Sequence, residues 1–133
     1  MITGVVNALG EARIGLTLRG RAGQAREIEA VVDTGFTGYL TLPSARITEL
    51  QFEWLCREEG ILGDGSVRLF DVYEGTVLWD CKPRAIEVNA SETDALAGMG
   101  LIRGHLLKIE AVEGGRVTLD RIDESQPSPS SAE

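Results

Sequence analysis

One ten-residue stretch, Val-Val-Asp-Thr-Gly-Phe-Thr-Gly-Tyr-Leu at positions 31–40, most strongly restricts what this chain can fold into. Its β-branched residues favour a half-buried strand, which we expect over residues 29–32. Asp33 therefore stands where a buried strand opens into a tight loop. The two glycines allow backbone angles that are closed to other residues, and the two threonine hydroxyls can satisfy backbone groups. The stretch predicts a carboxylate held near the interior by a rigid turn.

Short apolar runs separated by turn residues continue along the chain, a pattern typical of an all-β domain. Strands are predicted at 2–7, 12–18 and 28–32, the second of them from a strict alternation of apolar and polar residues. A helix of about two turns is predicted up to Leu50, packed outside the sheet and capped by the hydroxyl of Thr41.

Two hairpins are predicted in the middle of the chain, and a third closes it over residues 108–119. The first turns at 63–66, Gly-Asp-Gly-Ser, where Asp-Gly supplies the positive φ angles that a two-residue turn needs. The second turns at 79–82 between apolar strands. After them, the run at 95–102 is read as a buried strand that ends in Gly98, which opens a short helix.

The Asp-Thr-Gly loop, the hairpin that follows it and the apolar-apolar-Gly run, which ends 65 residues after Asp33, occur in a recognisable order. In this order the chain resembles the retropepsin-like (clan AA) aspartic proteases. It looks most like the bacterial single-domain members, which carry Asp-Thr-Gly-Phe-Thr-Gly as this chain does. The resemblance covers residues 1–122 and implies an all-β fold, a closed acid-protease barrel with one or two short helices, which acts as a twofold homodimer.

The resemblance also implies roles for individual residues. Asp33 is the expected catalytic residue; Thr34 would brace the two loops across the dimer axis, and Gly35 would let substrate approach. A flap over the substrate is implied at Gly63, Asp64 and Gly65. A support beneath the loop is implied at Leu96, Ala97 and Gly98.

The dimer follows from the chemistry, because peptide hydrolysis by this route needs two carboxylates that share a proton across one water. A chain with one Asp-Thr-Gly must pair its Asp33 with Asp33 of a second copy. By resemblance, the strand near 117–122 can interleave with its counterpart in the partner. Viral members have Arg, then Asn or Asp, where Met99 and Gly100 stand here, and Ala in place of Phe36, so the dimer contact and the pocket differ in detail.

Composition excludes several other classes of protein. The net charge of −8 and a pI near 4.7 argue against nucleic-acid and anionic-membrane partners. No apolar run of about 18 residues predicts a membrane span, and the N-terminus lacks a signal-peptide pattern, so we expect a cytoplasmic protein. Cys56 and Cys81 are expected to be reduced. The single histidine, His105, is read as a polar cap after the short helix, and no spacing predicts a metal or another cofactor.

The function predicted from the sequence is therefore an aspartic endopeptidase that cleaves peptide or protein substrates as a homodimer. One alternative is a non-catalytic peptide-binding or dimerisation module that retains the fold, and another is a subunit that needs a different partner chain. Residues 1–122 are expected to form one domain, and the Pro- and Ser-rich residues 123–133 a disordered polar tail.

Overall fold

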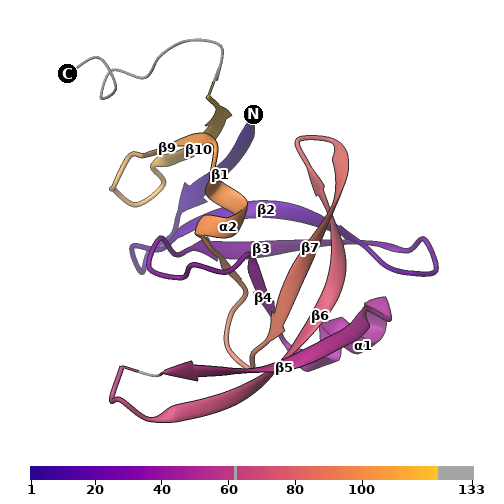
Figure 1. Ribbon diagram of the computed structural model, residues 1–133. Helices are drawn as coiled ribbons and strands as arrows, with labels where there is room; N and C mark the ends of the chain where they lie inside the picture. The colour runs from indigo at the N-terminus through magenta and orange to yellow at the C-terminus, as the bar shows by residue number, and fades with distance from the viewer. Residues whose placement is uncertain (62, 123–133) are drawn as a thin grey trace.

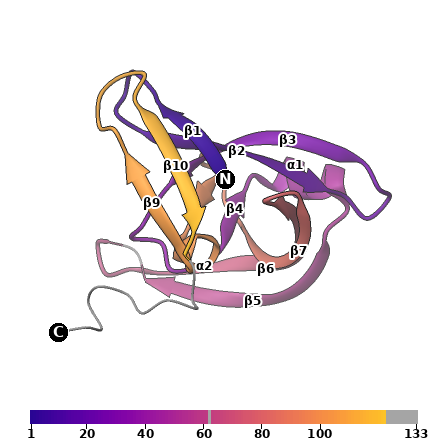
Figure 2. The ribbon, with the colours of Figure 1, turned by 90° about the horizontal axis from the view of Figure 1, so that it is seen from above.

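The computed structural model of the protein describes residues 1–61 and 63–122, which form a mostly-β fold with two short helices (Figures 1 and 2). The predicted disordered tail at 123–133 lies outside the described residues. The elements in chain order are β1 (Ile2–Val6), β2 (Ala12–Arg19), β3 (Ala25–Val32), β4 (Leu40–Leu42), α1 (Ser44–Leu50), β5 (Glu53–Ile61), β6 (Val67–Trp79), β7 (Lys82–Ala90), β8 (Leu96–Ala97), α2 (Met99–Ile102), β9 (His105–Ile109) and β10 (Arg116–Arg121).

The strands join into one mixed sheet in the order β5-β6-β7-β4-β8-β3-β2-β1-β10-β9. An additional antiparallel pairing of β6 with β2, from Thr17 opposite Leu78 to Arg19 opposite Thr76, bends part of this sheet into a ring. Strand β5 extends from the ring on one side, and β1, β10 and β9 extend on the other. The all-β character and the short helices agree with the prediction.

The core includes residues of the ring strands and of β1 and β10, and it follows the predicted alternation. In β2 the apolar residues at 12, 14, 16 and 18 are buried, whereas the residues between them are exposed or half-buried. Helix α1 packs Ile47 and Leu50 against the same core. Burial of such side chains contributes roughly 1.5–3 kcal/mol each, so the core is the main source of the fold's stability.

The predicted helix cap is wrong. Pro43 occupies the cap position of α1, and no side chain caps the helix. The hydroxyl of Thr41 is buried and accepts a hydrogen bond from the backbone N–H of Leu96 at 2.9 Å instead. Because a buried N–H needs a partner, this long-range bond takes the hydroxyl that the local pattern assigned to the helix.

The hairpins lie where the sequence predicts them, with one difference. Asp80 and Cys81 form a two-residue turn with φ of 54° and 69°, between the paired residues Trp79 and Lys82. In the first hairpin, the last paired residues are Ile61 and Val67, so the connection is longer than the predicted two-residue turn. Strands β9 and β10 form the predicted final hairpin.

Strand β10 is paired on both sides, with β1 and with β9. The pairing with β1 covers residues 116–119 of β10 and the pairing with β9 covers residues 117–121, so within the described chain Asp120 and Arg121 have a strand neighbour on the β9 side alone. The interleaving of residues 117–122 with the same strand of a second copy stays a prediction, with residues 117–119 already paired on both sides.

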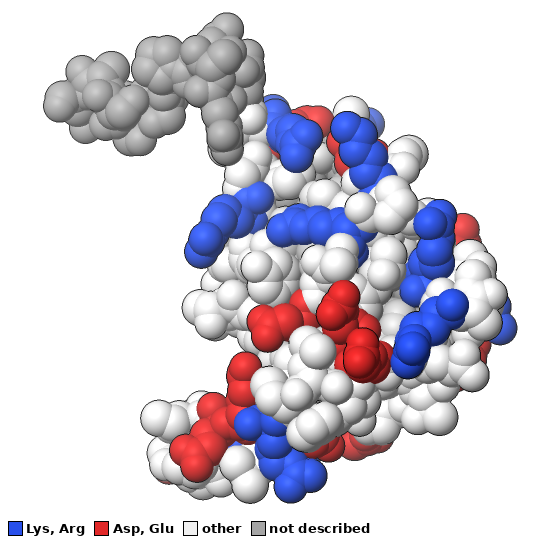
Figure 3. All heavy atoms as spheres, turned by 45° about the vertical axis from the view of Figure 1, so that its right-hand side comes forward, with Lys and Arg blue, Asp and Glu red and all other residues white. Residues whose placement is uncertain are grey.

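Acidic side chains gather in the lower half of the face shown in Figure 3. Among the acidic residues of the sheet, Glu53 lies opposite Glu74 on the neighbouring strand, and Glu74 lies opposite Glu87 on the next. All three side chains are exposed. Like charges directly opposite each other on adjacent strands destabilise a sheet.

We therefore expect Glu74→Gln to stabilise the protein, because it removes both repulsive pairs at once. The urea midpoint should rise by about 0.3 M at low ionic strength, with a smaller gain in high salt. Glu59→Gln is the matched control, since exposed Glu59 lies opposite Leu69. An equal gain in both variants would show that net charge, and not the register of the strands, is responsible.

Candidate active site

The Asp33 loop, residues 33–39, is clamped at its base by strand β8. This strand lies between the two strands that flank the loop, parallel to β3 and antiparallel to β4. The backbone N–H of Asp33 donates to the carbonyl of Ala97 at 2.9 Å, and the N–H of Gly98 donates to the carbonyl of Tyr39 at 2.9 Å. Both ends of the loop are thus fixed to two consecutive residues, Ala97 at the end of β8 and Gly98 directly after it.

Helix α2 continues this support along the loop. The N–H of Met99 donates to the carbonyl of Phe36 at 2.8 Å, and that of Gly100 donates to the carbonyl of Gly38 at 2.9 Å. The glycines allow this contact of backbone with backbone: a Cβ on Gly98 would lie 2.4 Å from the Gly38 carbonyl oxygen, and one on Gly100 would lie 2.8 Å from it. Leu96, Ala97 and Gly98 are therefore found beneath the Asp33 loop.

Gly98→Ala should be strongly destabilising, because its methyl group would meet the backbone of the loop and not a flexible side chain. We expect a loss of about 2–4 kcal/mol in the free energy of unfolding, measured by urea denaturation. Gly15→Ala is the control, because a Cβ on Gly15 in β2 meets nothing within 4 Å. This control should be neutral or slightly stabilising; a tolerated Gly98→Ala would mean that the loop does not rest on α2 as described.

The Asp33 side chain is half-buried, and its carboxylate is oriented by its own loop. Oδ1 accepts a hydrogen bond from the N–H of Gly35 at 3.0 Å, and the Asp33 carbonyl accepts one from Phe36 at 3.2 Å. A Cβ on Gly35 would lie 3.3 Å from Oδ1, so glycine keeps this approach open. Within the described residues, no second carboxylate is hydrogen-bonded to Asp33.

Thr34 and Thr37 differ from the prediction. Both side chains are exposed, and among the described residues neither hydroxyl makes a hydrogen bond. The loop is instead satisfied by the carboxylate of Asp33 and by the backbone of β8 and α2. The hydroxyl of Thr34 stays available at the surface.

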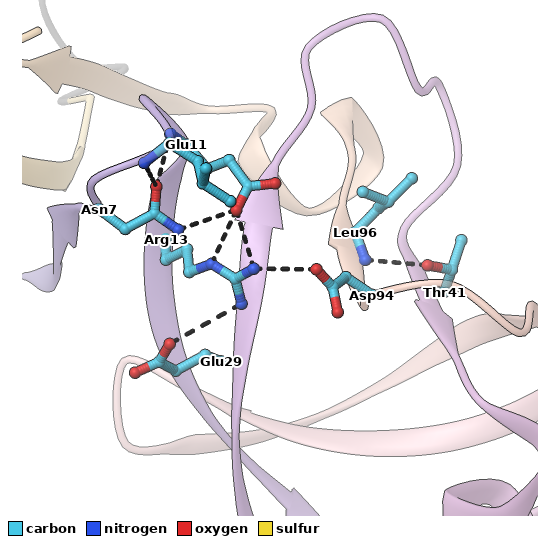
Figure 4. A network of polar contacts seen from close by, with 8 residues as sticks. Asn7, Glu11, Arg13, Glu29, Thr41, Asp94 and Leu96 are labelled. Atoms are coloured by element: carbon cyan, nitrogen blue, oxygen red, sulfur yellow. Dashed lines mark hydrogen bonds and ion pairs between the residues drawn. The ribbon is translucent and has the colours of Figure 1, made fainter.

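A second set of polar contacts fixes the segment that leads into β8 (Figure 4). Arg13 of β2 donates to Glu11 and to Asp94, each at 2.9 Å, and its guanidinium lies 3.9 Å from Glu29. A hydrogen bond from Asn7, together with Arg13, lowers the pKa of Glu11. Arg13 thereby joins the first strands of the chain to the residues just before β8.

Arg84 of β7 contacts the Asp33 loop, helix α2 and Trp79 of β6. Its guanidinium lies over the rings of Tyr39 and Trp79, at 5.7 and 6.0 Å from their centroids, and donates to the Gly100 carbonyl at 3.3 Å. A cation over an aromatic face is attracted by the ring's electron density. Arg84 therefore contacts both the end of the Asp33 loop and α2.

His105 follows α2 as a polar cap, because its ring is hydrogen-bonded to the carbonyl of Arg103, the residue that ends this helix. It is the first residue of β9, and its Nε2 accepts a hydrogen bond from the indole N–H of Trp79 at 3.2 Å. Since an indole nitrogen can only donate, Nε2 carries no proton, and Nδ1 donates to the Arg103 carbonyl at 3.1 Å. His105 is thus a neutral packing partner of Trp79, with the two rings in an edge-to-face arrangement.

The predicted flap is the β5–β6 hairpin, which projects from the lower part of the molecule on the same side as the Asp33 loop (Figures 1 and 2). Asp64 accepts hydrogen bonds from the N–H and the hydroxyl of Ser66, at 2.9 and 2.6 Å, which lower the pKa of Asp64. Gly65 has φ of 84°, and Gly63 is exposed. Near the tip, Ile61, Val67 and Leu69 are exposed apolar residues.

The residues that could have held a metal are scattered. In the ranges 1–61 and 63–122, no three His, Cys, Asp or Glu side chains are grouped as metal ligands. The two cysteines form no disulfide with each other. Neither described helix has the length and apolar character needed to cross a membrane.

The structure thus brings together Asp33, its loop and the support from β8 and α2, and leaves the flap apart from them. Comparison of the chain with protein-family models, with curated proteins and with solved structures found no match. The contributions of Arg13, Thr41, Arg84 and Asp94 are not apparent in the sequence, because each depends on a partner far away along the chain. The arrangement offers one oriented carboxylate on a braced loop.

Proposed function

We propose that the chain is one subunit of a homodimeric aspartic endopeptidase with an acid-protease fold. The observation that carries this proposal is the clamped Asp33 loop: a half-buried carboxylate follows a strand, and β8 lies between that strand and the next. The arrangement holds one carboxylate in a fixed direction, which positions it for proton transfer. A second copy would supply the second carboxylate.

In the dimer, the two Asp33 carboxylates share one proton, because two like charges a few Å apart cannot both ionise. The ionised carboxylate takes a proton from a water, whose oxygen forms a bond to the carbon of the scissile peptide. The other carboxylate gives its proton to the carbonyl oxygen. The C–N bond then breaks as the carboxyl that took the water's proton gives it to the nitrogen, while the other carboxylate takes back a proton from a hydroxyl of the intermediate. The products are a carboxylic acid and an amine, and the pair again shares one proton. The two carboxylates titrate as one coupled unit.

The remaining elements have supporting roles in this proposal. Gly35 leaves room for an extended peptide beside Asp33, since even a methyl group there would crowd the carboxylate. The β5–β6 hairpin would close over the peptide and exclude water. Its exposed apolar side chains would then contact the substrate.

The test is to incubate the protein with a mixed peptide library between about pH 3 and 7 and to identify new termini by mass spectrometry. We expect cleavage, and inhibition by a statine-type peptide that mimics the tetrahedral intermediate, since such mimics bind tightly to the catalytic geometry. Binding of peptides without cleavage at any pH would favour the non-catalytic module instead.

A further inference from the structure

Strand β9 ends the sheet with an edge that no other described strand covers. It is the last strand in the sheet order and pairs only with β10 among the described residues. Unpaired edges are ready templates for pairing with another chain. Residues 117–119 of β10 have neighbours on both sides, so β9 offers the longer uncovered edge at this end of the sheet, as far as the described residues show.

The register shows which residues of β9 face outward. The N–H of Glu110 donates to the Arg116 carbonyl, and that of Ile122 donates to the Gly104 carbonyl. Hydrogen-bonded positions alternate along an antiparallel pair, so the backbone groups of 104, 106, 108 and 110 point toward β10. The N–H and C=O groups of His105, Leu107 and Ile109 therefore point toward the open edge.

This edge lies on the same side of the molecule as the candidate active site. Figures 1 and 2 both show β9, the Asp33 loop and the tip of the β5–β6 hairpin on the left. Only Arg103 and Gly104 separate β9 from α2, which rests directly on the Asp33 loop. A copy that docks along β9 therefore lies on the same side of the molecule as the Asp33 loop.

Charge distinguishes β9 from β5, the strand at the other end of the sheet. Strand β5 carries three glutamates and one arginine, and its pairing with a copy would bring like charges together in a chain of net charge −8. Strand β9 carries one formal charge, on Lys108, since His105 is neutral. The exposed side chains of β9 include the apolar residues Leu106 and Ile109.

We propose that a second copy of this chain pairs with the first along β9, antiparallel and symmetric about Leu107. In this register Leu107 lies opposite Leu107 of the partner subunit, and His105 lies opposite Ile109 of the partner subunit. All three outward-facing residues then form backbone hydrogen bonds with the other chain. Leu106 lies opposite Lys108 of the partner subunit on one face of the joined sheet. This inference rests on the proposed function, because it names the contact that completes the site.

The first variant to test is Ile109→Pro, with the dimer dissociation constant measured by sedimentation. Proline is tolerated on an edge strand whose N–H faces solvent, so the monomer should keep its circular dichroism spectrum and thermal midpoint. Each dimer loses two hydrogen bonds, and we expect the dissociation constant to rise about tenfold or more. Val67→Lys, at an exposed apolar site on the flap, is the control and should leave the dissociation constant unchanged.

A charge swap tests the register itself. Leu106→Lys should also raise the dissociation constant, because it sets a lysine opposite Lys108 of the partner subunit twice in each dimer. Adding Lys108→Glu to the same chain turns both contacts into attractive pairs and should restore dimerisation. A double variant as weak as Leu106→Lys alone overturns this register.

The outcomes separate this inference from the proposed function. A parent protein that stays monomeric, or a dimer that Ile109→Pro leaves intact, overturns pairing along β9. A dimer that Ile109→Pro dissociates, but that cleaves no peptide, supports the interface and contradicts the peptidase. A dimer that cleaves peptides and loses both properties together in Ile109→Pro supports both.

Discussion

Asp33→Asn is expected to lower the rate of peptide cleavage by at least about 10³-fold, the largest effect of any single substitution in this chain. An amide can neither take a proton from the water nor share one with a second carboxylate. The fold should be unchanged, because the Asn side-chain oxygen can still accept the hydrogen bond from the Gly35 N–H. The measurement is the initial rate on a cleaved library peptide, together with the thermal midpoint.

Asp120→Asn provides the matched control, since Asp120 lies on β10 and outside the Asp33 loop. It makes the same chemical change and should leave the cleavage rate within about twofold of the parent rate. Sedimentation should show that Asp33→Asn still dimerises, which separates loss of chemistry from loss of assembly. Full activity in Asp33→Asn would remove Asp33 from the reaction and end the proposed mechanism.

The local sequence predicts the position of Asp33 and the elements around it, because the controlling forces there act over short distances. β-Branched residues favour the strand before Asp33, glycines favour the loop, and alternation in β2 predicts which side chains are buried. Even the role of Gly98 has a local signal, an apolar pair followed by glycine. The resemblance to retropepsin-like proteases adds the expectation that this segment lies under the loop, and the structure places it there.

The errors share one physical cause, which is competition from distant partners. Thr41 is a good helix cap by type and position, but its hydroxyl bonds the Leu96 N–H, 55 residues away. His105 contacts the Arg103 carbonyl at the end of α2, as its position predicts, but its second contact, with the distant Trp79, is not apparent in the sequence. Arg13 alternates correctly in its strand, but only the fold shows that it meets Asp94.

The second large effect concerns assembly. Adding a ninefold excess of Asp33→Asn chains to the parent protein should lower the activity per parent chain about tenfold. If subunits exchange freely, roughly nine in ten parent chains then pair with a variant chain, and each such dimer has a single carboxylate. Activity is measured after incubation at a concentration where sedimentation shows dimers. A two-carboxylate monomer would lose nothing, because its site would be complete within one chain.

The control for this mixing experiment is a chain that carries both Asp33→Asn and Ile109→Pro. It is as defective chemically but should pair poorly along β9, so an equal excess should leave the parent activity nearly unchanged. Poisoning by the single variant but not by the double variant would tie the loss of activity to pairing through β9. Equal poisoning by both would mean that the subunits meet elsewhere, and no poisoning by either would mean that one Asp33 is sufficient. The mixing result therefore tests the half-site character of Asp33 directly, because it changes the partner of each parent chain and leaves the parent chain itself unaltered.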